Sequence, residues 1–241
     1  MPNPQMPNPK MPNPKIPVTK PAGPIRHHLS DRLLIAYAAG SLPEAFGLVV
    51  ATHVSMCDDC RARLSAFEAL GGAVLDAGAE AEAEAGAEVS DASLALVMAR
   101  LERPGVAKLE VARRTGVLPT PLAAYVGGDL DAVKWKSLGM GVRQAILPTA
   151  KSATARLLYI PAGQAVPDHG HRGTELTLVL QGAFRDATDR FGPGDLEIAD
   201  QALEHKPVAE PGAACICLAA TDAPLRFLGL VPRLLQPLFR I

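Results

Sequence analysis

Three residues of metal-binding type lie close together in the first quarter of the chain. His53, Cys57 and Cys60 form an H-x3-C-x2-C cluster. If the chain turns between two helices here, the three side chains converge on one ion. Thiolates and imidazoles suit zinc, which takes four ligands in tetrahedral geometry. His27 and His28 are the candidates for the fourth ligand, and the pattern predicts a closed, structural zinc site.

A second group of such residues lies in the other half of the chain. His169, His171 and Glu175 stand close together, and His205 follows. Residues spaced by two in an extended segment project to the same side of a strand, so the two histidines can share an ion. Three imidazoles and a carboxylate suit zinc, manganese, iron or nickel, and this set can leave a position open. The residue types predict a second metal site and leave its ion open.

Helical spacing surrounds the first group. Ser30 can cap a short helix, and Ser41–Glu44 reads as a capping box that opens a second helix carrying His53. A third helix is expected from Asp58 or Asp59. A fourth follows Asp91 and carries an apolar stripe that either joins the core or faces a partner. The stripe consists of Leu94, Val97, Met98 and Leu101.

Short apolar runs, separated by Gly, Pro and Asp, surround the second group. They are expected to be strands of a small barrel or jelly roll. The runs are Gln144–Leu147, Arg156–Ile160, Glu175–Leu180, Leu196–Ala199, Cys215–Ala219 and Leu225–Leu228. Cys215 and Cys217 face the same side of one strand. We expect them to pack as small hydrophobic residues, with oxidation sensing as the alternative.

These patterns predict an α+β chain with two domains: a small helical zinc-binding domain and a β-barrel of jelly-roll type. Residues 76–88 are almost all Ala, Gly and Glu, and we expect a linker there, with a solvated extension of the third helix as the alternative. The predicted divisions are 1–24 for an extended, disordered proline-rich repeat tail, 25–101 for the helical domain, 102–121 for a linker and 122–241 for the barrel.

The composition narrows the class of protein. The formal net charge is −1, which argues against direct binding to DNA, because that needs a basic surface. Four cysteines spaced as C-x2-C and C-x-C suggest metal ligands or redox thiols in a reducing compartment. Neither a signal peptide nor an apolar run long enough to span a membrane is visible, so a cytoplasmic protein is expected.

The first cluster resembles the zinc-binding anti-sigma (ZAS) domain family, in which H-x3-C-x2-C joins an upstream histidine. The resemblance covers about residues 26–101, and His28-Leu29-Ser30-Asp31 is similar to the start of that family. It implies His28 as the fourth ligand beside His53, Cys57 and Cys60. It also implies a four-helix unit that clamps an extracytoplasmic-function sigma factor.

The second group resembles the cupin superfamily. Gly163-x5-His169-x-His171-x3-Glu175-x6-Gly182 matches the first cupin motif at every defining position. In the second motif Gly194 and His205 keep the spacing. Departures from it, where many cupins have Pro, Gly and Asn, are Asp200, Ala202 and Ala209. The resemblance implies a cupin fold with His205 as a ligand, and the departures argue against a catalytic cupin family.

Taken together, the two parts resemble the ChrR anti-sigma factors. Segments similar to that family include HHLSDRLLIAYAAGSL, VVATHVSMCDDCRAR, VRQAILP, VPDHGHRGTELTLVLQGAFRD and CICLAATDAPLRF. The resemblance implies a cytoplasmic repressor, not an enzyme, that holds a group IV sigma factor in a 1:1 heterodimer and releases it under singlet-oxygen stress. It implies zinc at both sites, hence two ions per chain.

A metal-dependent cupin oxygenase or isomerase is the alternative. In that case His169, His171, Glu175 and His205 would hold Fe(II) or Mn(II). A stand-alone cupin enzyme has no need of a helical zinc unit, and the sequence offers no clear general base. Both points favour the regulator.

Overall fold

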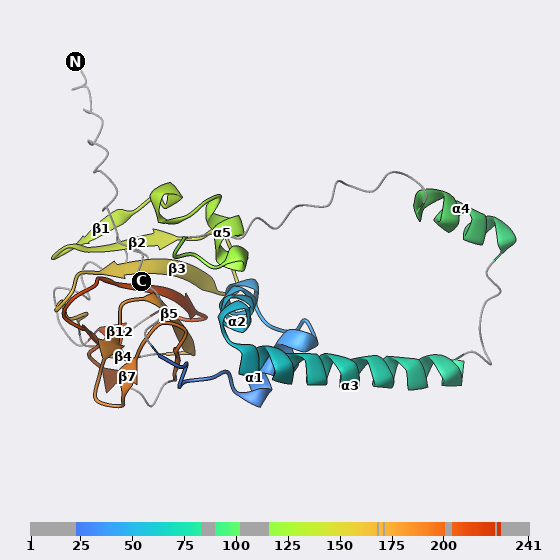
Figure 1. The fold of residues 1–241 in the computed structure, drawn as a ribbon, viewed down its shortest axis with the longest axis horizontal. Coiled ribbons are helices and arrows are strands. Elements are labelled where there is room, and N and C mark those ends of the chain that lie inside the picture. The colour runs from blue at the N-terminus through green and yellow to red at the C-terminus, as the bar shows by residue number, and fades with distance from the viewer. Residues whose placement is uncertain are drawn as a thin grey trace, which may run out of the picture.

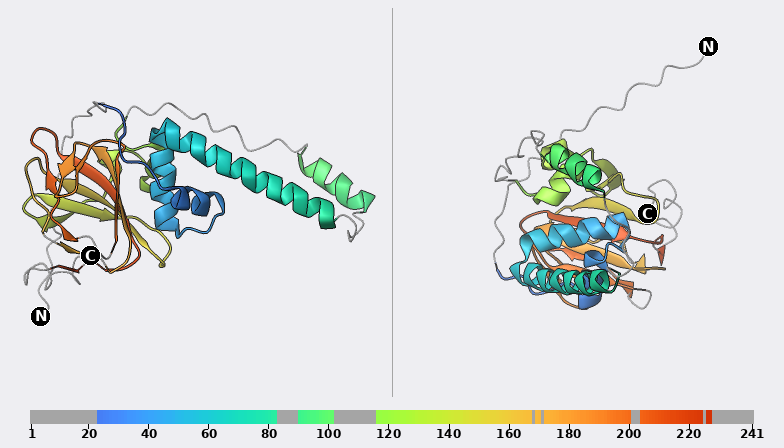
Figure 2. Two further views of the ribbon diagram at one scale, coloured as in Figure 1. Left: turned by 90° about the horizontal axis from the view of Figure 1, so that it is seen from below. Right: turned by 90° about the vertical axis from the view of Figure 1, so that its right-hand side faces the viewer.

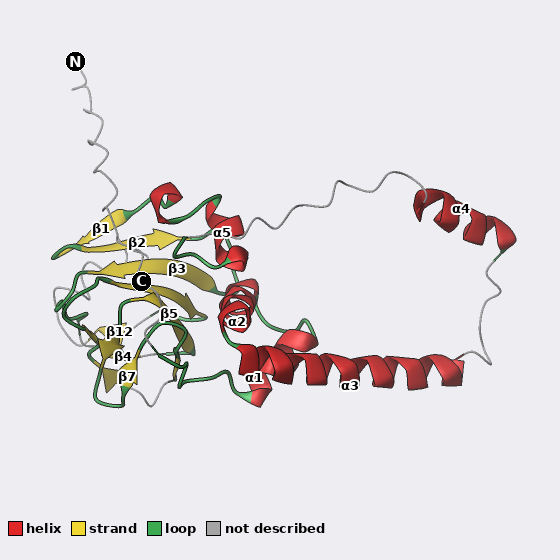
Figure 3. Ribbon diagram, in the orientation of Figure 1, coloured by secondary structure: helices red, strands yellow, loops and turns green. Residues whose placement is uncertain are grey.

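In the computed structural model, helices come first along the chain and strands follow, which confirms the α+β class (Figures 1 and 3). The structure describes residues 23–82, 90–101, 116–167, 169–170, 172–200, 204–224 and 226–227. Within these ranges no helix is both long and apolar enough to cross a membrane.

The first two helices form a short pair. In α1 (Asp31–Ala38) the Ser30 side chain accepts a hydrogen bond from the Leu33 amide, as the capping prediction requires. The capping box predicted for α2 (Glu44–Met56) is wrong. Pro43 occupies the cap position and cannot accept with its side chain, and the Ser41 hydroxyl donates instead to the Ala36 carbonyl.

Two further helices extend away from this pair. Helix α3 (Asp58–Glu82) starts where it was predicted and continues into the expected Ala/Glu-rich linker, because both residue types favour helix. Helix α4 (Asp91–Leu101) has no buried residue. Figure 1 shows α4 beyond the far end of α3, away from the sheets. The apolar stripe of α4 therefore does not pack in the core, and the partner-facing role remains.

All the predicted strands are present, with additional short ones, although Leu225 and Leu228 of the last predicted run lie outside the described residues. The strands are β1 Lys136–Gly139, β2 Val142–Ile146, β3 Thr154–Ile160, β4 His169–Gly170, β5 Glu175–Gln181, β6 Phe184–Arg185, β7 Arg190–Phe191, β8 Leu196–Ala199, β9 Glu204–His205, β10 Val208–Ala209, β11 Cys215–Thr221 and β12 Arg226–Phe227. They form antiparallel sheets in the orders β1-β2-β3-β11-β5-β8, β10-β6-β7 and β12-β4-β9. This is the predicted cupin-like β domain.

The central strands of the large sheet are buried on both faces. Every residue of β5 and β11 is buried. One face carries a row of register partners that includes Leu157, Leu218 and Leu178, and α2 packs on strands β3, β5 and β11. Figure 2 shows α2 against the sheets in both views. The other face holds Val179 and Cys217 inside the barrel. The apolar core therefore runs without a break from helices to sheet.

The end of the predicted linker also packs against this core. Residues 102–115 lie outside the described part. Beyond them, Leu118 is buried and Asp129 accepts hydrogen bonds from the Val117 and Leu118 amides. Helix α5 (Thr120–Val126) follows and contacts α2. The Tyr125 hydroxyl donates to Glu44 at 2.7 Å, which ties α5 to the start of α2.

Two glycines of the cupin motifs have positive φ and also stand where a side chain would clash with a neighbour. At Gly182 (φ 70°) a Cβ atom would lie 2.5 Å from the Ala214 carbonyl oxygen. At Gly194 (φ 91°) it would lie 2.5 Å from the side chain of Ile25, in the segment before α1. Gly194 therefore allows the N-terminal segment to approach the β domain closely.

Candidate metal centres

The junction of α2 and α3 builds the first centre. His53 lies in the last turn of α2, Cys57 is the extended residue that ends the helix, and Cys60 lies in the first turn of α3. This is the turn between two helices that the spacing predicted. All three side chains are buried. The Cys60 amide also points at the Cys57 sulfur, 3.5 Å away, so the start of α3 favours negative charge there.

His28 completes this group, which we call the cysteine centre (His28, His53, Cys57 and Cys60). Its Nδ1 atom lies 3.3 Å from the Cys57 sulfur and 3.7 Å from the Cys60 sulfur, and His53 Nε2 lies 3.3 Å from the Cys60 sulfur. All four ligand atoms lie within 4.8 Å of one another. Around tetrahedral zinc, imidazole nitrogens and thiolate sulfurs stand about 3.5 Å apart. The group could hold one such ion.

The charge states also suit a metal. Burial, and then the neighbouring Cys57, raise the pKa of the Cys60 thiol. Burial, together with the charge of His28, lowers the pKa of His53 to about 4, so that its imidazole is neutral at pH 7. A cation beside the buried Cys60 would favour its thiolate form, and neutral imidazole is the form that binds metal. A divalent ion supplies that charge.

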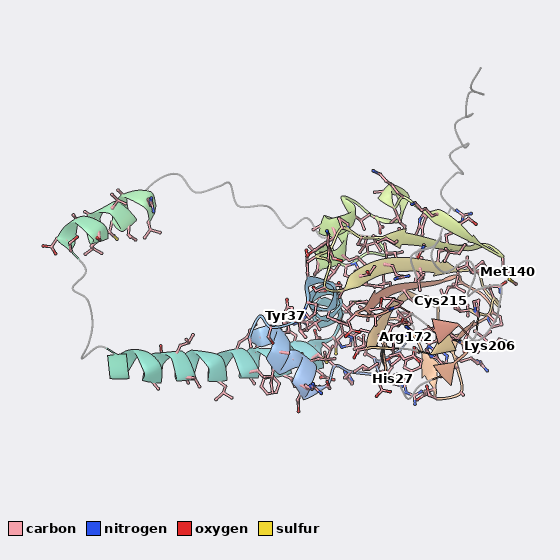
Figure 4. The ribbon with its side chains drawn as sticks, turned by 180° about the vertical axis from the view of Figure 1, so that it is seen from behind. His27, Tyr37, Met140, Arg172, Lys206 and Cys215 are labelled. Atoms are coloured by element: carbon pink, nitrogen blue, oxygen red, sulfur yellow. The ribbon has the colours of Figure 1, made fainter. Side chains whose placement is uncertain are left out.

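The neighbouring histidine has different partners. His27 Nε2 lies 3.1 Å from Asp189, and its ring packs on Phe191 with 4.4 Å between centroids. Its backbone amide donates to Asp195. Figure 4 labels His27 on the side of the helices that meets the β domain. His28, and not His27, therefore stands with the cysteines.

The second centre, which we call the histidine centre (His169, His171, Glu175 and His205), is only partly within the described residues. His169 and His205 are register partners on β4 and β9, and their Nε2 atoms lie 3.3 Å apart. His169 Nδ1 lies 2.8 Å from the Pro167 carbonyl, which can only accept, so this nitrogen carries the proton. On a neutral ring its Nε2 lone pair then faces His205. Two nitrogens about 3.3 Å apart match two ligands of one tetrahedral ion.

Of the other two predicted ligands, Glu175 and His171, only Glu175 lies within the described residues. Glu175 is buried at the start of β5, and its carboxylate accepts from the Thr177 hydroxyl at 2.9 Å. Burial lowers the pKa of His205, but hydrogen bonds to Glu197 and Asp186 and the charge of Glu175 outweigh it and raise that pKa. His171 lies outside the described residues, as does Ala202 of the second motif.

Sequence reasoning missed two buried carboxylates beside His205. Asp186 Oδ2 and Glu197 Oε1 each lie 3.0 Å from His205 Nδ1. Burial raises the pKa of Glu197. At Asp186 burial also raises the pKa, but hydrogen bonds from Thr188 outweigh it and the net pKa is lowered. Strand alternation puts Glu197 on the face opposite Leu196 and Ile198, and its pairing with Thr177 on β5 turns that face into the barrel.

Cys215 and Cys217 lie inside the barrel. Both are buried, and their sulfurs are 3.5 Å apart. The hydrogen bond with Cys215, followed by burial, raises the pKa of Cys217, so that its thiol stays protonated. This is the environment of the small hydrophobic residues that the sequence analysis expected.

Comparison with known proteins gives consistent matches. A family model described as the ChrR cupin-like domain matches residues 124–224. The anti-sigma-E factor ChrR of Cereibacter sphaeroides is 63% identical over 217 residues, which cover 90% of this chain and 99% of the relative. A crystal structure of Rhodobacter sphaeroides SigE in complex with the anti-sigma ChrR holds a chain of 62% identity with a TM-score of 0.69. The match covers 82% of this chain and 99% of that one.

Proposed function

Because the chain belongs to the ChrR family of anti-sigma factors, we propose that it binds one sigma-E-type factor and keeps that factor inactive. The observation that carries the proposal is the 63% identity, which extends over both the helical and the β part. The family consists of regulators, so the oxygenase or isomerase alternative is set aside. Its partner acts with RNA polymerase, and we therefore place the protein in the cytoplasm.

We assign the binding of the sigma factor to residues 25–101. Two helices in this range expose large apolar side chains, which is unusual for a surface without a partner. We call this set the α3–α4 apolar surface. It comprises Leu70, Val74 and Leu75 on α3 and Leu94, Leu96, Val97, Met98 and Leu101 on α4, each at least half exposed. An amphipathic helix of this kind fits an apolar groove on a partner.

In this proposal zinc occupies both centres, two ions per chain. Zinc in the cysteine centre would fasten the N-terminal segment and the ends of α2 and α3 together, which a helical unit this small needs. Zinc in the histidine centre has no redox chemistry of its own, in keeping with a regulator. His171 and Glu175 would join His169 and His205 there. The β part, residues 122–241, would sense singlet oxygen, and residues 102–121 would link it to the helical unit.

Binding to Rhodobacter sphaeroides SigE tests the first part of this proposal. Isothermal titration of the full chain should give a 1:1 complex. Met98→Glu and Leu94→Glu should weaken it at least tenfold, because they place charges on the α3–α4 apolar surface. Met140→Glu is a matched control, since Met140 is 77% exposed in the turn between β1 and β2 (Figure 4). Equal affinity of all variants would reject the surface, and no binding by the unmodified chain would reject the partner.

A transcription reporter tests the sensing part. His169→Ala should leave the sigma factor repressed and should abolish its release when a photosensitiser generates singlet oxygen. Truncation near residue 110 is no substitute for this variant, because it removes the sheet that covers α2 in the shared core. If His169→Ala still released the factor in the light, sensing would lie outside the histidine centre.

A further inference from the structure

We propose that Glu197 and Asp186 are positioning residues of the histidine centre: they keep the proton of His205 on Nδ1, so that Nε2 offers its lone pair to the metal ion. The inference rests on the proposed metal centre and assigns a role to two residues outside its ligand set. Both carboxylates lie 3.0 Å from the same ring nitrogen. The Asp186 and Glu197 side chains are 0% and 5% exposed.

Hydrogen-bond chemistry fixes the direction of these contacts. Asp186 accepts three hydrogen bonds from Thr188 and Asp189, as an ionised carboxylate does, so the ring nitrogen that faces it must donate. A neutral imidazole has one N–H group, and a proton on Nδ1 therefore leaves Nε2 as the acceptor. His169 has the same arrangement, with Nδ1 held by the Pro167 carbonyl. When both rings are neutral, their Nε2 atoms, 3.3 Å apart, direct lone pairs into the space between them, and a cation bound there would hold both rings in that form.

The two carboxylates are themselves held in place by the fold. Glu197 lies in β8, where it is the register partner of Thr177 on β5, inside the barrel. Asp186 follows β6 and accepts hydrogen bonds from the Thr188 amide (2.8 Å), the Thr188 hydroxyl (2.6 Å) and the Asp189 amide (3.2 Å). Neither side chain needs to move to meet His205. Outer partners fixed in this way commonly orient the histidines that bind metals.

A different arrangement of the same residues is conceivable and makes a distinct prediction. Asp186, Glu197 and His205 Nδ1 are close enough to bind a cation directly. In that case Glu197 is a ligand, and Glu197→Gln should lose metal binding, because an amide does not replace a carboxylate ligand. In the positioning role Glu197→Gln should retain metal binding, because the amide oxygen still accepts from Nδ1–H. Glu197→Gln therefore separates the two roles, while Glu197→Leu removes both.

The experiment is a chelator competition on the full zinc-loaded chain. Zinc in the cysteine centre serves as the internal reference for affinity. A separate cobalt-substituted sample identifies that centre by its thiolate-to-cobalt absorption. Glu197→Leu should bind zinc in the histidine centre roughly 10–100-fold more weakly, and Glu197→Gln should stay close to the unmodified protein. Equal loss in both variants would make Glu197 a ligand, and no loss in either would leave it without a role; each result overturns the proposal.

A histidine-selective proton–nitrogen spectrum of the unmodified chain needs no variant and covers the case in which Glu197→Leu does not fold. His205 should show a proton on Nδ1 and none on Nε2. A proton on Nε2 of the zinc-loaded chain would overturn the proposal. A proton on Nδ1 in a chain that binds only one zinc ion would support the positioning role and reject the second metal centre. Failure of the positioning role and failure of the metal centre therefore give different results.

Discussion

The carboxylate of Asp195 accepts a hydrogen bond from the backbone amide of His27, with 2.9 Å between Oδ1 and the nitrogen. Asp195 lies in the turn before β8, and His27 is next in sequence to His28 of the cysteine centre. The same oxygen also accepts from the Arg26 amide at 2.6 Å, and the Leu196 amide donates to the His27 carbonyl. One carboxylate thus attaches the N-terminal segment of the cysteine centre to the β domain.

Replacing Asp195 with alanine should therefore weaken both parts. It leaves the Arg26, His27 and Gly192 amides without this acceptor, at a cost of roughly 1–3 kcal/mol for each amide that water cannot reach. Zinc should leave the cysteine centre faster, as a colorimetric chelator can follow. Asp195→Asn retains Oδ1 as an acceptor, so its rate of zinc release should lie between those of the unmodified protein and Asp195→Ala. Identical zinc release from all three proteins would show that this attachment does not support the centre.

The packing of α2 on the sheet predicts cooperative unfolding. Leu218 is fully buried on the face of β11 that α2 covers. Leu218→Ala should destabilise the protein by about 2–5 kcal/mol, because the cavity adds to the lost burial. Helical circular dichroism and the fluorescence of Trp135, next to β1, should shift together. Ile198→Ala, at a position 43% exposed, is the control and should change little. Separate transitions for the two signals would contradict one shared core.

The contact between Glu44 and Tyr125 predicts a dependence on acid pH. Hydrogen bonds from the Tyr125 hydroxyl and then the Ala150 amide lower the pKa of Glu44 below 4.5. The unfolded chain therefore binds this proton more readily, so the stabilisation is present above about pH 4.5 and is lost as the pH falls through the lower folded value. Glu44→Gln should show a smaller loss of melting temperature between pH 5 and pH 3. A steeper loss in the variant would reverse the sign.

Metal content should follow the two centres separately. Protein purified without added metal should contain two zinc ions per chain by elemental analysis, and His169→Ala should contain one while still binding the sigma factor. The reason is that His169, Glu175 and His205 lie on strands of the β part, apart from the ligands of the cysteine centre. Iron in the second centre, with oxygen consumption on a dicarbonyl substrate, would contradict the regulatory account and support an enzyme.

Local patterns made much of this architecture predictable. The H-x3-C-x2-C spacing places its three residues at a single helix junction, and short apolar runs bounded by Gly, Pro and Asp mark the main strands. The features that were missed depend on contacts between distant parts of the chain. The predicted cap of α2 was wrong because the Ser41 hydroxyl donates to the Ala36 carbonyl and does not cap the helix. The cover that α2 gives the leucine face of the sheet, and the meeting of Asp186 and Glu197 at His205, depend on the tertiary fold.

Binding of SigE to the full chain and to its Cys57→Ala variant tests the central claim most directly. The account predicts a 1:1 complex with the unmodified protein, and a loss of affinity of at least tenfold in the variant, because removing a ligand forfeits the folding free energy that zinc supplies. Chelation of zinc from the unmodified protein should have the same effect, and added zinc should restore binding. Unchanged affinity in Cys57→Ala and after chelation would contradict the claim that a zinc-organised helical unit holds the sigma factor.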